Sequence, residues 1–149
     1  MKREETVDFN IKVVWHSIAR MYNQQASKYD ASMNMGFALL NISSEGTPAT
    51  KIAPLMGLET RSLTRLLKTL EEKNLIFRKL DQQDKRCVRV FLTPEGIKQK
   101  EKAREAVIRF NEVIREDIGE KKLSFLLEIL QRINALIDQQ LIFEKEMVI

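Results

Sequence analysis

The fold is decided by residues 60–96, which read TRSLTRLLKTLEEKNLIFRKLDQQDKRCVRVFLTPEG. In the first part of this stretch, leucines recur at steps of three and four residues, with basic side chains between them. This spacing predicts a helix over about 60–73 that has one apolar face and one basic face. The apolar face holds Leu63, Leu66, Leu67 and Leu70, and the opposite face holds Arg61, Arg65, Lys68 and Glu72.

Asn74 is a suitable left-handed residue for the end of that helix. Beyond it the apolar period changes from helical to alternating, which predicts strands over residues 75–80 and 87–92. The polar residues 81–86 between the strands are too many for a tight two-residue turn. We therefore expect a two-stranded hairpin, here called the wing, with basic residues at its tip.

A second short helix is predicted just before the basic one. Thr47 and Pro48 indicate its start, with the Thr47 hydroxyl as the cap and Pro48 at the first helical position. Gly57 permits a left-handed end, and Pro54 is expected to kink or loosen the last turn. Two short helices in tandem followed by a hairpin predict a winged helix-turn-helix.

Long amphipathic helices are predicted on both sides of this lobe. On the C-terminal side, Thr93-Pro94 indicates a helix start, Ile118-Gly119 predicts a break, and a last helix is expected to carry apolar residues from Leu123 to Leu141. The chain is interpreted as one mainly α-helical domain over residues 1–149, with a winged lobe at about 35–93 and flanking helices at about 7–30 and 94–145. The apolar stripes of these helices exceed what one small core can cover, so we expect a second copy to cover them in a homodimer. The alternative is a monomer that folds the helices onto its own core. The expected interface residues are Ile11, Leu130, Ile133 and Ile137.

Charge is concentrated in one short part of the chain. The 149 residues carry a formal net charge of +4. Residues 60–89 hold nine basic and four acidic side chains, a net +5, so the remainder carries −1. Such clustering is typical of a surface that binds nucleic-acid phosphates, although a solvated face with chance clustering explains the charge equally well by itself.

A basic helix beside a hairpin predicts contacts with duplex DNA. The helix fits the major groove, where arginine can bind guanine or phosphate, and Arg86 at the wing tip is expected in the adjacent minor groove. Lys68 is expected to meet the phosphate backbone. A two-fold dimer would read an inverted repeat with half-sites about 34–36 Å apart. The predicted DNA contacts are Thr60, Arg61, Ser62, Thr64, Arg65, Lys68, Lys85 and Arg86.

In element order the chain resembles the MarR family of transcriptional regulators. The segment Ser62–Arg78 is similar to the family's recognition helix and first wing strand, and Asp81–Arg86 is similar to its Asp-x-Arg-Asp-x-Arg wing motif. Residues 92–96, Leu-Thr-Pro-Glu-Gly, resemble its Leu-Thr-x-x-Gly junction. The resemblance implies that Asp84 braces the wing and that Arg86 contacts the minor groove. Gln83 departs from the motif because it stands where the family has its first wing arginine.

The resemblance also implies an effector site. Small aromatic effectors of the family bind between the dimer helices and the DNA lobe, and aromatic and methionine side chains suit such a pocket. A plain hydrophobic core is the alternative explanation for the same residues. The expected cleft residues are Trp15, Tyr22, Met35 and Phe37.

Two residue types occur only once and limit other chemistry. His16 is the only histidine, which argues against a histidine-based metal site, and we expect a structural or surface imidazole. Cys87 is the only cysteine, so no internal disulfide is possible. Arg86 and Arg89 beside it make a low-pKa thiolate conceivable, but an ordinary strand residue is the preferred interpretation, because family members that sense oxidants place their cysteine near the N-terminus.

These observations favour a DNA-binding transcriptional regulator, with repression or activation left open. The alternative is a winged-helix protein-interaction module without specific DNA binding, which the arginine missing at Gln83 slightly favours. An enzyme is not expected, because no catalytic triad spacing, phosphate-binding glycine loop or metal cluster is found. We expect no cofactor, no membrane segment and a cytoplasmic location.

Overall fold

The structure is a computed structural model that describes residues 1–144. It divides into two compact units, residues 1–107 and the chain from 108 onward. The first unit contains a short 3-10 turn (Arg3–Glu5), α1 (Val7–Ser27), α2 (Met33–Leu40), β1 (Thr47–Pro48), α3 (Ala49–Met56), α4 (Thr60–Glu72), β2 (Ile76–Leu80), β3 (Val88–Leu92) and the first part of α5 (Pro94–Ile118). The second unit contains the rest of α5, α6 (Glu120–Asp138) and α7 (Leu141–Glu144). No helix in the described part of the chain is long and apolar enough to cross a membrane.

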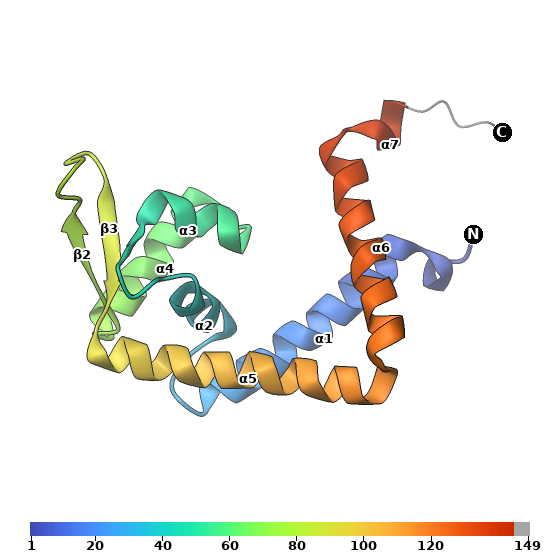
Figure 1. Cartoon of the computed structure of the whole chain (residues 1–149), viewed down its shortest axis with the longest axis horizontal. Helices are drawn as coiled ribbons and strands as arrows, with labels where there is room; N and C mark the ends of the chain where they lie inside the picture. The colour runs from blue at the N-terminus through green and yellow to red at the C-terminus, as the bar shows by residue number, and fades with distance from the viewer. Residues whose placement is uncertain (145–149) are drawn as a thin grey trace. The chain divides into compact units, whose positions relative to one another are not determined.

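The winged helix-turn-helix predicted from the sequence is confirmed. Helices α3 and α4 follow each other in tandem, and β2 and β3 form the adjacent hairpin (Figure 1). Gly57 ends α3 with φ +63°, and Asn74 follows α4 with φ +57°, as the sequence predicted. Pro54 lies inside α3.

The prediction for Thr47 and Pro48 was wrong. They form β1, which pairs antiparallel with β3 through Thr47 opposite Val90 and Pro48 opposite Arg89. The sheet therefore has three strands in the order β1-β3-β2, where two were expected. The Thr47 hydroxyl accepts a hydrogen bond from the Ser43 amide at 2.9 Å, so it turns back toward the preceding loop and does not cap α3, which begins one residue after Pro48.

The core of the lobe joins the inner faces of these elements. Helices α2, α3 and α4 and the inner side of the sheet supply it, and Ile42, Ile52, Leu70 and Val90 are fully buried. At the calibration of about 25 cal/mol per Å² of apolar surface, each such side chain contributes roughly 1.5–3 kcal/mol to folding. The remaining core residues are Met35, Ala38, Leu39, Ala53, Leu63, Leu67, Leu75 and Ile76.

Helix α5 starts where the sheet ends, as the Thr93-Pro94 pair predicted. The buried Thr93 hydroxyl accepts from the Gly96 amide at 3.0 Å and donates to the Asn74 carbonyl at 2.7 Å. Gly96 is required here because a Cβ at this position would lie 1.9 Å from the Leu75 carbonyl oxygen. The Lys100 amine donates to the Ile42 carbonyl at 2.5 Å and joins α5 to the end of α2.

In the second unit Gly119 separates α5 from α6, as predicted. It has φ +90° and stands at the N-cap of α6, and Arg115 forms an ion pair with Glu120 at 2.7 Å across this break. The last helix was expected to run through Leu141, but α6 ends at Asp138, and Gln140 with φ +55° separates it from α7.

Candidate nucleic-acid interface

Helix α4 presents the two faces that its sequence predicts. Leu63, Leu67 and Leu70 are buried in the lobe, so the helix is held by its leucine side. Every side chain of the predicted contact set on this helix is exposed, namely Thr60, Arg61, Ser62, Thr64, Arg65 and Lys68. The Thr64 hydroxyl donates to the Thr60 carbonyl at 2.9 Å, which leaves its oxygen available as an acceptor.

Three basic residues of the cluster at 60–89 are used inside the lobe. The Lys73 amine lies 2.7 Å from the Asp30 carboxylate and ties the end of α4 to the α1–α2 turn. The Arg78 guanidinium binds both carboxylate oxygens of Glu71, with its shortest distance 2.8 Å. Each partner lowers the pKa of the carboxyl group that it contacts, chiefly through the hydrogen bond. The third, Arg89, binds Asp81.

Six basic residues of this cluster remain exposed without an ion pair within the described residues, and one of them, Lys79, has its amine 5.4 Å from the centre of the Phe77 ring. The other five are the arginine and lysine members of the predicted contact set: Arg61, Arg65, Lys68, Lys85 and Arg86. A cation that lacks an internal carboxylate is free to bind an external anion without first breaking an ion pair. The structure thus separates the basic cluster into an internal set and a set directed at solvent.

The wing loop is held by aspartate carboxylates that bind backbone amides. Asp84 Oδ1 accepts from the Arg86 amide at 3.0 Å, and the Asp84 carbonyl accepts from the Cys87 amide at 3.0 Å. Asp81 Oδ1 accepts from the amides of Gln83 and Asp84 at 2.8 and 3.3 Å. The hydrogen bond from the Gln83 amide is the main cause of a lowered pKa of Asp81. The Arg89 guanidinium and the Asp84 amide lower this pKa further.

Sequence reasoning missed Asp81 and Arg89 as members of this arrangement. Arg89 Nε lies 3.0 Å from Asp81 Oδ2, and its Nη1 donates to the Gly46 carbonyl at 3.0 Å. One signal was present, because Arg89 pairs across the strands with Lys79, and like charges directly opposite each other are unfavourable unless a carboxylate lies nearby.

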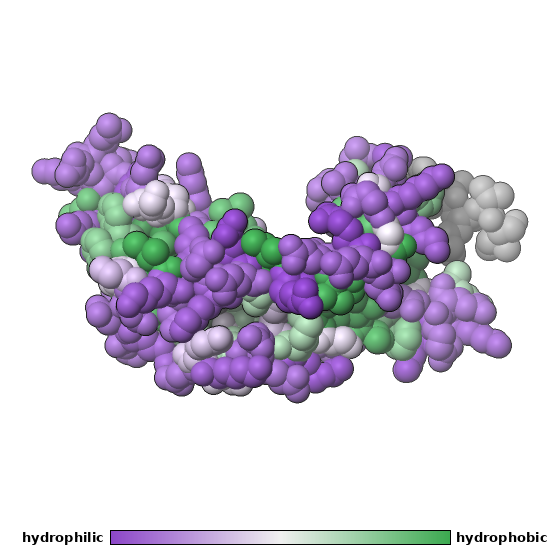
Figure 2. All heavy atoms as spheres, turned by 60° about the horizontal axis from the view of Figure 1, so that its bottom comes forward, coloured by the Kyte–Doolittle hydropathy of each residue, from purple (hydrophilic) through white to green (hydrophobic). Residues whose placement is uncertain are grey.

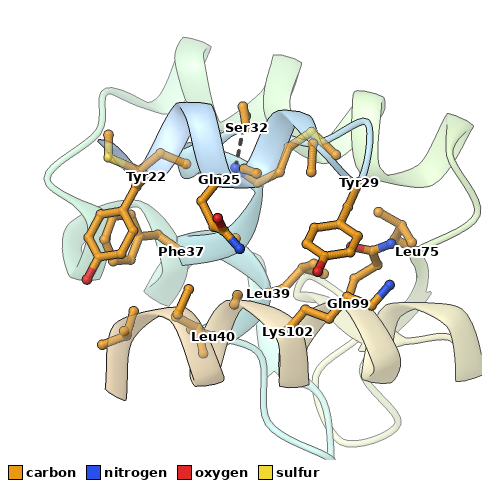
Figure 3. A pocket seen from close by; sticks show the side chains of 18 residues that line it. Tyr22, Gln25, Tyr29, Ser32, Phe37, Leu39, Leu40, Leu75, Gln99 and Lys102 are labelled. Atoms are coloured by element: carbon orange, nitrogen blue, oxygen red, sulfur yellow. Dashed lines mark hydrogen bonds between the residues drawn. The ribbon is translucent and has the colours of Figure 1, made fainter. Parts of the chain in front are cut away.

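A pocket lies in the first unit between α1, α2 and α5 (Figure 3). Tyr22 and Phe37 lie together at one end with ring centroids 5.8 Å apart, and Tyr29 lies at the other end with the Lys102 amine 4.2 Å from its ring centre. Burial raises the pKa of Tyr22. The lining is mainly apolar, with polar groups from Gln25, Ser32, Gln99 and Lys102.

Three of the four residues predicted for an effector cleft line this pocket, and one does not. Tyr22, Met35 and Phe37 are among its walls. Trp15 is 49% exposed and lies with His16 on a shallow surface formed by α1 alone. Trp15 is therefore not part of this pocket, and its place in an effector cleft stays a prediction.

The Cys87 thiol faces a carboxylate, so the possibility of a low-pKa thiolate is not supported. Its Sγ lies 3.7 Å from Asp84 Oδ2, and the Asp84 charge raises the pKa of Cys87. No group of three or more potential metal ligands is found in the described residues.

The residues predicted for a dimer interface lie in both units. Ile11 on α1 and Ile137 on α6 are 42% and 54% exposed, and Leu130 and Ile133 on α6 are half-buried. Figure 2 shows hydrophobic side chains reaching the surface between hydrophilic ones. Further exposed apolar residues are Val7, Val14 and Met21 on α1 and Phe125, Leu126, Leu127 and Ile129 on α6.

The comparisons with known proteins agree with the resemblance read from the sequence. The model of the MarR family matches residues 37–88. The organic hydroperoxide resistance transcriptional regulator of Bacillus subtilis (strain 168) is 29% identical over 140 residues, covering 90% of this chain and 95% of that protein. A family model over the winged lobe and a relative of similar length thus both agree with the resemblance that the sequence indicates.

Solved structures share the fold over most of the chain. The S. aureus MepR-DNA complex superimposes with a TM-score of 0.80 at 22% identity and covers 87% of this chain and 97% of that one. CouR from Rhodococcus jostii RHA1, bound to p-coumaroyl-CoA, gives a TM-score of 0.76 at 21% identity and covers 89% and 94%. At these identities the two structures establish the winged-helix fold.

Proposed function

From the MarR-family lobe at residues 37–88, we propose that this chain is a homodimeric, sequence-specific DNA-binding transcriptional regulator. Helix α4 enters the major groove and the wing places Arg86 in the adjacent minor groove. The proposal depends mainly on the two faces of α4. Its basic side chains Arg61, Arg65 and Lys68 are exposed and form no ion pair within the described residues, and its leucines are buried in the lobe. Support comes from the Bacillus subtilis relative, a transcriptional regulator, and from MepR, whose structure holds DNA.

The dimer is proposed from the exposed apolar side chains of α1 and α6. A soluble protein with these exposed apolar side chains needs a partner that covers them, and a second copy of the chain is the simplest such partner. The dimer then presents two α4 helices to an inverted repeat. A non-enzymatic role in the cytoplasm, where the DNA lies, completes this proposal.

Binding to selected DNA tests the proposal. Duplexes enriched from a random pool by the purified protein are titrated against unselected duplex, with fluorescence anisotropy as the measurement. Arg65→Ala and Arg86→Ala are each expected to weaken binding to the selected site by about 1–3 kcal/mol. Arg109→Ala, which removes an exposed arginine from α5, is the matched control and is expected to bind normally.

Two results would count against it. Equal affinity for selected and random duplex argues for the alternative, a winged-helix interaction module without specific DNA binding. A monomer at micromolar concentration in sedimentation removes the basis for an inverted repeat.

We further propose that the pocket between α1, α2 and α5 binds a small aromatic effector that weakens DNA binding. Its aromatic ends and apolar walls suit a flat ring, and Lys102 can approach an anionic substituent. A panel of small aromatic carboxylates is screened for a rise in melting temperature, since a ligand that binds the native state stabilises it. Tyr22→Leu is expected to reduce the rise, whereas Trp15→Leu, outside the pocket, is expected to keep it.

A further inference from the structure

The loop of the wing is linked to the turn before β1 by one arginine side chain. Arg89, on β3, binds Asp81 Oδ2 through Nε at 3.0 Å and Nη2 at 2.9 Å. Its third contact, from Nη1, goes to the Gly46 carbonyl at 3.0 Å. We call this set, Asp81, Arg89 and Gly46, the Arg89 bridge. It links the end of β2, the middle of β3 and the turn before β1.

The Gly46 end of the bridge is a fixed anchor. Its carbonyl also accepts from the Ser43 hydroxyl at 2.8 Å. Gly46 has φ +85°, and a Cβ there would lie 2.5 Å from the Phe91 ring, so only glycine fits the turn. The Phe91 ring is in turn stacked on the Phe77 ring, with the two ring centroids 5.3 Å apart. The arginine therefore reaches from the wing to a part of the lobe whose position is set by packing.

The Asp81 end of the bridge controls the path of the wing loop. The other carboxylate oxygen of Asp81 holds the amides of Gln83 and Asp84, and Asp84 holds the amide of Arg86. The Asp81 amide also donates to the Cys87 carbonyl at 2.9 Å, which closes the base of the loop. A continuous series of hydrogen bonds thus runs from Gly46 to the backbone of Arg86.

We propose that Arg89 is a positioning residue that holds the wing loop so that Arg86 can enter the minor groove. The inference rests on the proposed DNA-binding function. Arg89 itself is not offered to DNA, because its guanidinium is bound to Asp81 and Gly46 and is only 32% exposed. A planar guanidinium can bind a carboxylate with two donors and a carbonyl with a third, which a lysine amine cannot do in the same geometry.

A double-mutant cycle on DNA binding tests the role. We expect Arg89→Gln to weaken binding about tenfold and Arg86→Ala to weaken it about tenfold, because each loses the minor-groove contact. The double variant is expected to lose no more than Arg86→Ala alone, since the two act through one contact. In the double variant with Arg65→Ala on α4, by contrast, the fold-losses of DNA affinity from Arg89→Gln and Arg65→Ala are expected to multiply.

Conservative and matched variants separate geometry from charge. Arg89→Lys keeps the positive charge and is expected to bind as weakly as Arg89→Gln. Lys79→Gln removes a positive charge from the residue opposite Arg89, and Lys79 has no ion pair within the described residues. It is expected to change affinity less than twofold. Should Arg89→Gln fail to fold, Asp81→Asn weakens the same bridge from its other end and replaces it in the cycle.

A second readout does not require DNA. Cys87 is the only thiol in the chain and sits at the base of the loop, against Asp84. Release of the loop moves it from that carboxylate, so Arg89→Gln is expected to speed alkylation of Cys87 by iodoacetamide severalfold, while Lys79→Gln leaves the rate unchanged.

The inference is overturned by any of three results: losses from Arg89→Gln and Arg86→Ala that multiply, wild-type affinity for Arg89→Lys, or an unchanged alkylation rate in Arg89→Gln. Failure of the wild-type protein to bind any DNA would instead overturn the proposed function. The alkylation rate still reports in that case whether Arg89 holds the loop.

Discussion

The salt dependence of DNA binding provides a quantitative test of the exposed basic set. The predicted contact set of each subunit holds five unpaired cations, Arg61, Arg65, Lys68, Lys85 and Arg86, so the proposed dimer offers about ten. The logarithm of the association constant falls with the logarithm of salt concentration by about 0.9 for each phosphate neutralised. The upper value of the slope is then about −9, or roughly a 10⁵-fold loss of affinity between 50 and 200 mM salt.

The perturbation is Lys68→Gln, which removes one phosphate contact from each subunit. Two contacts fewer per dimer reduce the slope by about 1.8, to about −7, while the preference among sequences is kept because a phosphate contact carries no base information. Lys12→Gln on α1 makes the same change of charge on an exposed side chain outside the winged lobe and is the matched control.

The assay is anisotropy of a labelled duplex titrated with protein at five or more salt concentrations. The expected result is a smaller slope for Lys68→Gln and a wild-type slope for Lys12→Gln. The reasoning is refuted if Lys68→Gln keeps the wild-type slope, or if both variants lower it equally, because the effect would then depend on net charge and not on the position of α4.

Three further predictions follow from packing and protonation. Leu70→Ala, at a fully buried position, is expected to lower the free energy of unfolding by about 2–5 kcal/mol, and Leu55→Ala, 64% exposed, by less than about 0.5, as measured by urea denaturation. Arg78 lowers the pKa of Glu71 from 4.5, so this ion pair stabilises the fold above pH 4.5, and its contribution is lost as pH falls through the lowered pKa. Glu71→Gln is therefore expected to make the free energy of unfolding decline less steeply in acid. A decline as steep as that of the wild type would show that the pair contributes nothing. Because Asp84 raises the pKa of the Cys87 thiol, Cys87→Ser is expected to leave any peroxide response of DNA binding unchanged, and loss of such a response in this variant would contradict that interpretation.

Features that depend on neighbouring residues in the chain were predictable. The leucine and arginine spacing of α4 sets both of its faces, and Gly57, Asn74 and Gly119 mark helix ends, because a left-handed backbone selects these residues wherever they occur. The Thr93 cap was predicted for the same reason, since its bond to Gly96 spans only three residues.

Features that depend on distant partners were not predictable. Thr47-Pro48 has the local form of a helix start, yet pairing with β3, more than forty residues away, makes it a strand. Trp15 and Tyr22 lie seven residues apart on nearly the same side of α1, yet only Tyr22 lines the pocket, because its walls come from α2 and α5, which are distant in the sequence. The role of Arg89 was hidden because its acceptor on Gly46 is 43 residues distant.

By itself the sequence determined that this chain has a basic helix backed by leucines, followed by a hairpin, because helical and strand periods are local properties. Only the tertiary structure decided which cations remain for DNA and which are neutralised inside the lobe. Lys73, Arg78 and Arg89 resemble Arg65 and Lys68 in the sequence, but ion pairs form where the fold brings a carboxylate within about 3 Å, and that distance is set by packing.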